Sequence, residues 1–172
     1  MPTPITNPIR LEILKRMTVA LQEITVLNGY VNDLEGRVFR GRGVYGDETP
    51  LPALSILEAP IPLDQLPSAK DNVNLAGTWE LVVQGWVNDD RKNPTDPAQV
   101  LLADVKKRLA LERKKVDADQ PENGIFGLGR SVFGLYIGAG VVRPPEEISA
   151  KAYFWLTITL DIAEDMSEPY TT

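Results

Sequence analysis

The stretch AKAYFWLTITLDIAED, residues 150–165, constrains the fold more than any other part of this sequence. Apolar side chains stand at every second position, and a different set of side chains fills the positions between them. The first set is Ala152, Phe154, Leu156, Ile158, Leu160 and Ile162, and the second is Tyr153, Trp155, Thr157, Thr159 and Asp161. Side chains along a strand point alternately to the two faces of a sheet. The pattern therefore predicts a sheet with one face under helices and the other partly in water.

Other segments predict the remaining strands. GTWELVVQGWVND, residues 77–89, alternates in the same way and is typical of an inner strand. LPALSILEAP, residues 51–60, predicts a short strand bounded by prolines, which cannot donate to an interior ladder. GRVFRGRGVYG, residues 36–46, predicts a strand or hairpin arm with a bend at Gly41–Gly43, and LYIGAGVV, residues 135–142, predicts another short strand. PIPLDQLPSAKDNVN, residues 60–74, indicates an exposed connector.

Two segments have helical periodicity. In the first, one apolar stripe recurs at spacings of three and four: Ile13, Met17, Leu21 and Ile24. Asn7 is expected to cap its start, Pro8 suits the first helical position, and Asn28-Gly29 is expected to end the helix.

The second helix is predicted to begin with Asp96 as N-cap and Pro97 at its first position. Its apolar residues are Leu101, Leu102, Val105 and Leu109, followed by either Leu111 or Glu112. The fold predicted is α+β: a mostly antiparallel four- or five-stranded sheet with two helices packed on one face. One domain, 1–172, includes a Gly-rich arm or loop at about 117–149 and a loose C-terminal tail, 164–172.

The sequence contains neither cysteine nor histidine. Disulfides, Cys or His nucleophiles, Ser–His pairs and an imidazole general base are therefore excluded. The usual zinc ligands are missing as well, so only an all-oxygen Mg²⁺ or Ca²⁺ site remains open. We expect no catalytic residue, no cofactor and no metal.

The formal net charge of −6 argues against a general nucleic-acid binder, which needs a dominant basic face. The N-terminal segment carries charges where a signal peptide needs an apolar core. We expect a soluble protein made in a cytoplasm, with no membrane partner and no specific nucleic-acid binding.

Gly41, Gly43 and Gly46 have the G-x-G-x-x-G spacing of a dinucleotide-binding turn. Such a turn must lead into a helix, whose N-terminus supplies N–H groups to the pyrophosphate. The segment DETPLPALS follows instead, and its prolines and strand pattern leave no room for that helix. We interpret the glycines as a bend or bulge in a strand.

GIFGLGRSVFG, residues 124–134, lacks the Lys-Ser/Thr pair of a Walker phosphate loop. It is either an internal packing loop or a flexible, partner-facing loop, because exposed apolar groups usually mark interfaces. The basic run from Lys106 to Lys115 is either a solvated helix end or a surface for an acidic neighbour. Carboxylate neighbours such as Asp89-Asp90 and Glu146-Glu147 point apart in an extended chain and make poor catalytic pairs.

Three segments in this order resemble the tail terminator, or tail completion, proteins of long-tailed bacteriophages. They are NPIRLEILKRMTVALQEI at 7–24, VFRGRGVYGDETPLPALSILEAP at 38–60, and WELVVQGWVNDDRKNPTDPAQVLLADVKKRLAL at 79–111, followed by the final strand AYFWLTITLDI. The segment from Asp117 to Ile148 departs from that family by its length and glycine content.

The resemblance implies an α+β virion subunit that forms a ring, commonly a hexamer, at the head-proximal end of the tail tube. Such a ring stops tube polymerisation and joins the tail to the head–neck connector or stopper protein. Its partners would be its own copies, the tube protein and the connector, first in the host cytoplasm and then in the virion. Three rivals stay open: another neck or minor tail protein, such as a head–tail connector subunit; a His-free enzyme that uses Mg²⁺ or a nucleotide; and a generic binding module of a cellular pathway, for which the sequence shows no recognition motif.

The contacts expected of such a subunit lie in loops and basic patches. From exposure and patch chemistry we predict nine interface residues: Arg40, Arg42, Lys106, Lys107, Arg108, Phe126, Leu128, Arg130 and Phe133.

Overall fold

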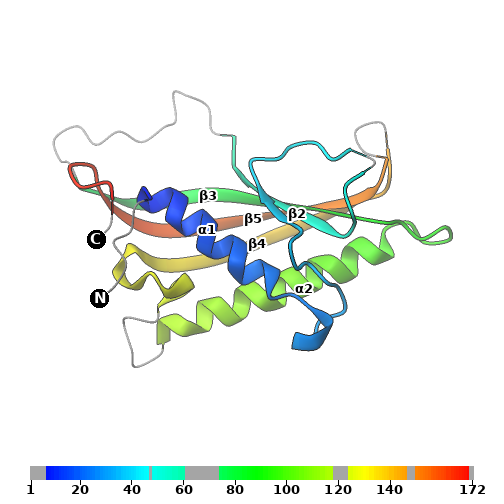
Figure 1. Ribbon diagram of the computed structural model, residues 1–172, viewed down its shortest axis with the longest axis horizontal. Coiled ribbons are helices and arrows are strands. Elements are labelled where there is room, and N and C mark those ends of the chain that lie inside the picture. Colours follow the sequence, from blue (N-terminus) through cyan, green and yellow to red (C-terminus); the bar gives the residue numbers. More distant parts are fainter. Residues whose placement is uncertain (1–6, 47, 61–73, 118–123, 147–149, 171–172) are drawn as a thin grey trace.

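The computed structural model describes residues 7–46, 48–60, 74–117, 124–146 and 150–170. Along these residues the chain forms two α-helices, several short 3-10 turns and one five-stranded sheet (Figure 1). The helices and turns are α1 (Ile9–Gln22), η1 (Val26–Asn28), α2 (Asp96–Arg113), η3 (Lys114–Asp117), η5 (Ile125–Gly127) and η6 (Gly129–Ser131). The strands are β1 (Val38–Arg40), β2 (Ala53–Glu58), β3 (Asn74–Val87), β4 (Val132–Arg143) and β5 (Ala152–Asp165). The predicted α+β fold is confirmed. The exposed connector predicted at 60–74 falls largely on 61–73, outside the described residues.

The strands lie in the order β1-β2-β3-β5-β4, so β1 and β4 form the two edges of the sheet. Every neighbouring pair is antiparallel except β1 and β2, which run parallel. The longest pairing joins β3 to β5, in unbroken register from Asn74↔Asp165 to Val87↔Ala152. β4 pairs with β5 less regularly, because its register shifts between Val132 and Gly134 and again between Ile137 and Gly140.

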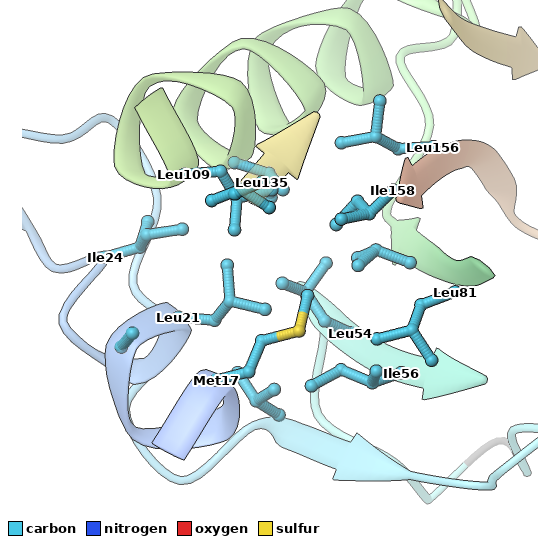
Figure 2. Close-up of a cluster of buried hydrophobic side chains, with 14 of the residues drawn as sticks. Met17, Leu21, Ile24, Leu54, Ile56, Leu81, Leu109, Leu135, Leu156 and Ile158 are labelled. Atoms are coloured by element: carbon cyan, nitrogen blue, oxygen red, sulfur yellow. The ribbon is translucent and has the colours of Figure 1, made fainter. Parts of the chain in front are cut away.

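Both helices pack on one face of this sheet, and the core lies between the two layers (Figure 1). The predicted alternation along β5 is confirmed, since all six apolar side chains of the inward set are buried. Figure 2 shows side chains from α1, α2 and the strands meeting in this core, among them Met17, Leu21, Leu109 and Leu156.

One residue of the outward set behaves differently from the prediction. Tyr153 is buried although it lies on the open face. It pairs across the sheet with Trp86, its ring lies 5.4 Å from that of Trp155, and its hydroxyl donates to the Glu146 carboxylate. Aromatic neighbours therefore cover it where no helix does.

The predicted apolar stripe is buried: Ile13, Met17 and Leu21 on α1, and Ile24 just beyond its end, have no exposed surface. The predicted ends of this helix are wrong. Asn7 does not cap it; its amide instead donates to Glu12 and accepts from Lys15. The helix stops at Gln22 rather than at Asn28-Gly29, because Glu23 and Ile24 donate to carbonyls three residues back and tighten the last turn.

Helix α2 begins at Asp96, with Thr95 in the cap position, one residue before the prediction. Of the two alternatives for its inner face, Glu112 points inward at 1% exposure and Leu111 is exposed. The helix therefore buries a carboxylate in its last turns.

The two ends of the described chain meet. The β5 strand runs to Asp165, past the start of the predicted loose tail. The Ile9 N–H donates to the Pro169 carbonyl at 3.2 Å, Pro8 and Tyr170 form an isolated bridge, and Arg10 forms an ion pair with Glu164. The tail as far as Tyr170 is therefore attached to α1. Likewise, half of the described part of the predicted Gly-rich arm is β4, a strand of the sheet.

Leu156→Ala should lower the free energy of unfolding by about 3 kcal/mol, because it empties a fully buried site between sheet and helices. Thr157→Ala is the matched control at the next position, on the open face, with an expected change below about 0.5 kcal/mol. Urea denaturation followed by circular dichroism measures both. Equal losses in the two variants would contradict the assignment of the two faces.

Candidate functional site

The G-x-G-x-x-G segment forms a bend between two strands. Gly41, directly after β1, has φ of +67°, and its N–H donates to the Ile56 carbonyl of β2 at 2.8 Å. The described residues that follow, 48–58, lead into β2 and contain no helix. The expected context is therefore confirmed, and the helix N-terminus that a pyrophosphate needs is not formed by these residues.

Aromatic side chains hold the chain after this bend against the open face of the sheet. The Arg42 guanidinium lies 4.7 Å from the ring centroid of Phe39 and 5.0 Å from that of Tyr45. The Tyr45 ring in turn lies 3.9 Å from that of Trp86 on β3. Burial in this cluster raises the pKa of Tyr45 to about 12, so its phenol is neutral at physiological pH. The stacked arginine and rings thus attach residues 42–45 to the open face of the sheet.

Beside the cluster lies a cavity of about 280 Å³. Tyr45, Trp86 and Tyr153 supply its aromatic walls, and Thr49 and Gln84 add polar groups. Asn88 and Lys151 also line the cavity, so its walls combine aromatic faces with polar and basic groups.

The basic run of α2 contains a buried ionic network rather than a uniformly solvated face. Arg108 is 6% exposed and binds two carboxylates, Glu112 at 2.7 Å and Glu23 at 2.6 Å, while its Nε donates to the Ala20 carbonyl. Glu112 also accepts from the Phe126 N–H at 3.1 Å. The network thus joins α1, α2 and the turn η5.

Burial alone would raise the pKa of Glu112. Hydrogen bonds from Lys115 and Arg108 outweigh it and hold the pKa below its usual 4.5. Glu112 is therefore ionised at neutral pH, and its charge compensates that of the buried guanidinium.

A turn surface, defined here as Val26, Leu27 and Val31, projects from the chain after α1. Leu27 is 98% exposed and Val31 71%. Carboxylates lie on one side of it, because Glu23, Asp33 and Glu35 line the same hollow as Leu27. Sequence reasoning missed this surface, although the signal was present: three apolar residues in a short segment beyond the helical stripe.

A second exposed surface follows the free edge of the sheet. A groove of about 410 Å³ runs between α2 and edge strand β4, and we call it the β4 groove. Its lining combines apolar, aromatic and basic side chains: Ala110, Arg113, Lys114, Phe133, Leu135, Tyr136 and Ile137. Phe133 is 50% exposed, and the Arg113 guanidinium lies 5.5 Å from the Tyr136 ring centroid.

The structure separates the nine predicted interface residues. Arg108 and Phe126 are buried in the network, so we no longer assign them to a contact surface. Arg42 is stacked on rings, and Lys107 is committed to the Gly29 carbonyl at 3.0 Å and to the ring of Tyr30. Phe133 lines the β4 groove. Of the other four, Arg40 is exposed and bonded to Thr18, Lys106 is half-buried on α2, and Leu128 (half-buried) and Arg130 (exposed) lie two residues apart at the turn η6.

No family model matches this chain, and no curated protein matches it. Among the residues that the structure describes, no helix has the length and apolar character needed to cross a membrane. The same residues contain no cluster of three or more His, Cys, Asp or Glu side chains placed to hold a metal ion.

Glu112→Gln should lower the free energy of unfolding by about 3 kcal/mol at neutral pH, because it leaves the buried Arg108 without its inner counter-charge. Since the folded-state pKa of Glu112 is depressed, this stabilisation is complete above pH 4.5 and is lost as pH falls through the lowered folded value.

The difference between wild type and variant should therefore shrink on acidification, which denaturant titrations across the acidic range measure. Glu80→Gln, on the exposed open face, is the control and should show no such trend. A difference that stays constant with pH would contradict the ionic role of Glu112.

Gly41→Ala should lower the free energy of unfolding by about 1 kcal/mol, because a Cβ at φ +67° is strained. Gly43→Ala is the matched control, since Gly43 lies outside the left-handed region and its surroundings are open. Thermal melts of both variants test this, and equal losses would show that the bend is not at Gly41.

Proposed function

We propose that this chain is a structural subunit of the tail terminator type, which assembles as a ring on the head-proximal end of a phage tail tube. The ring stops tube growth and presents a second surface to the neck connector. Its work is done by surfaces that match neighbouring subunits, with copies of itself, the tube protein and the connector as partners.

The observation that carries this proposal is the open face of the sheet. No helix of the described residues covers it (Figure 1). Tyr136, Val141 and Trp155 are nevertheless exposed on this face, near the free edge. An antiparallel sheet can keep one face in water, but exposed aromatic and aliphatic side chains on such a face are typical of protein contacts.

Two further features support the proposal. The fold is α+β, as the resemblance implies, and its elements run in the order helix, three strands, helix, two strands. The chain also offers chemically different exposed surfaces, the turn surface and the β4 groove, and a ring requires two different surfaces on each copy.

The test is an in vitro tube assembly assay with purified tube protein. Wild-type protein should appear as closed rings in electron micrographs and should reduce tube length when added during polymerisation. The double variant Val141→Glu, Trp155→Glu should fold, as judged by its melting curve, but should fail to shorten tubes. Thr157→Glu, on β5 like Trp155, is the control. It removes a smaller and less apolar side chain, so this variant should act nearly as wild type.

Tubes of normal length from particles that lack this protein would overturn the proposal. Rings that bind the connector but never the tube would favour the rival assignment to another neck protein. Substrate turnover that Asp→Asn changes abolish would favour the enzyme.

A further inference from the structure

We infer that copies of this chain associate head to tail, with the turn surface of one copy seated in the β4 groove of the next. The inference rests on the proposed ring assembly and specifies which parts of the chain build it.

The turn surface is held rigidly although its side chains are exposed. The Asn28 side chain donates to the Glu23 carbonyl at 2.8 Å, and the Asn28 N–H donates to Thr25 Oγ1. From α2, Lys107 donates to the Gly29 carbonyl, and Asp104 accepts from the N–H groups of Val31 and Asn32. An apolar projection that is already ordered loses little conformational entropy when it binds.

The β4 groove offers an apolar and aromatic lining. It lies along the edge strand of the sheet, so no further strand covers it among the described residues. Its aromatic side chains, Phe133 and Tyr136, stand half-exposed beside the aliphatic lining of Leu135 and Ile137. A leucine side chain that enters this groove would exchange water for apolar contacts on several sides.

Charge decides which surface meets which. Asp33 and Glu35 give the turn surface an acidic flank, since the charge of Glu23 in the same hollow is paired with Arg108. Arg113 and Lys114 give the β4 groove a basic one. Two turn surfaces would repel each other, and so would two grooves. A turn surface and a groove attract, and electrostatic complementarity of this kind selects partners and fixes their orientation more than it adds affinity.

The two surfaces lie at separate places along α2. The turn segment contacts Asp104 and Lys107, and the groove is lined by Ala110, Arg113 and Lys114, closer to the C-terminal end of the helix. Each copy thus presents one surface of each kind, which permits a heterologous chain of subunits, and such a chain closes into a ring where the rotation between copies allows it.

Cysteine cross-linking tests the contact directly, because the sequence has no cysteine of its own. A chain carrying both Leu27→Cys and Phe133→Cys should give a ladder of covalent oligomers after mild oxidation, seen on a non-reducing gel. A mixture of the two single variants should give covalent dimers and nothing larger. Leu27→Cys with Thr157→Cys, on the open face, is the control and should remain monomeric on the gel.

A charge exchange gives an independent readout by sedimentation velocity. Asp33→Lys with Glu35→Lys should abolish assembly when alone, because basic then faces basic. Arg113→Glu with Lys114→Glu should abolish it too, because acidic faces acidic. A mixture of these two variants should recover assembly with alternating copies, and melting curves check that each variant is folded.

The outcomes separate this inference from the proposed function. Normal assembly of each charge variant alone, or cross-linking of Leu27→Cys with itself as efficient as in the double variant, would overturn the head-to-tail contact. The proposed function would stand if such rings still shortened tubes. Conversely, a cross-linked ladder and a recovered mixture would support the contact even if wild-type rings left tube length unchanged.

Discussion

The continuous pairing of β3 with β5 is the constraint on which the rest of this structure depends. It joins Asn74–Val87 to Ala152–Asp165 without a register shift, although α2 and β4 lie between these strands in sequence. A slip by one residue would move Phe154, Leu156 and Ile158 from the covered face to the open one. The helices would then have nothing to pack on, so the alternation along β5 determines where both of them lie.

A buried ionic network connects the two helices and the turn η5, which the sheet does not connect. The Arg108–Glu112 pair lies on the covered side of α2 and reaches α1 through Glu23 and η5 through Phe126. A buried ion pair of this kind is weak evidence for extra stability, but it strongly disfavours arrangements that would leave either charge unpaired. It therefore fixes how the two helices lie against each other, which apolar contacts alone specify less sharply.

The hydrophobic periodicity of this sequence predicted the structure better than the identity of single residues did. The apolar stripe of the first helix and the alternation along β5 each rest on many positions, and both correctly predict which side of the element is buried. Asn7 failed as a cap because a single polar side chain can find other partners, here Glu12 and Lys15. Arg108 failed as a surface residue because composition does not reveal that Glu112 turns inward beside it. The exposure of Leu27 depends on where α1 stops, which local propensity does not fix.

The irregular edge of β4 has a consequence for how the molecule can meet others. Its register breaks at Val132/Gly134 and at Ile137/Gly140, so its outward N–H and C=O groups are not evenly spaced for a straight incoming strand. Open-ended extension of the sheet by strands of other molecules is therefore disfavoured at β4. A partner that binds at this edge would therefore be recognised by side chains, and such a contact is complete once one partner is bound.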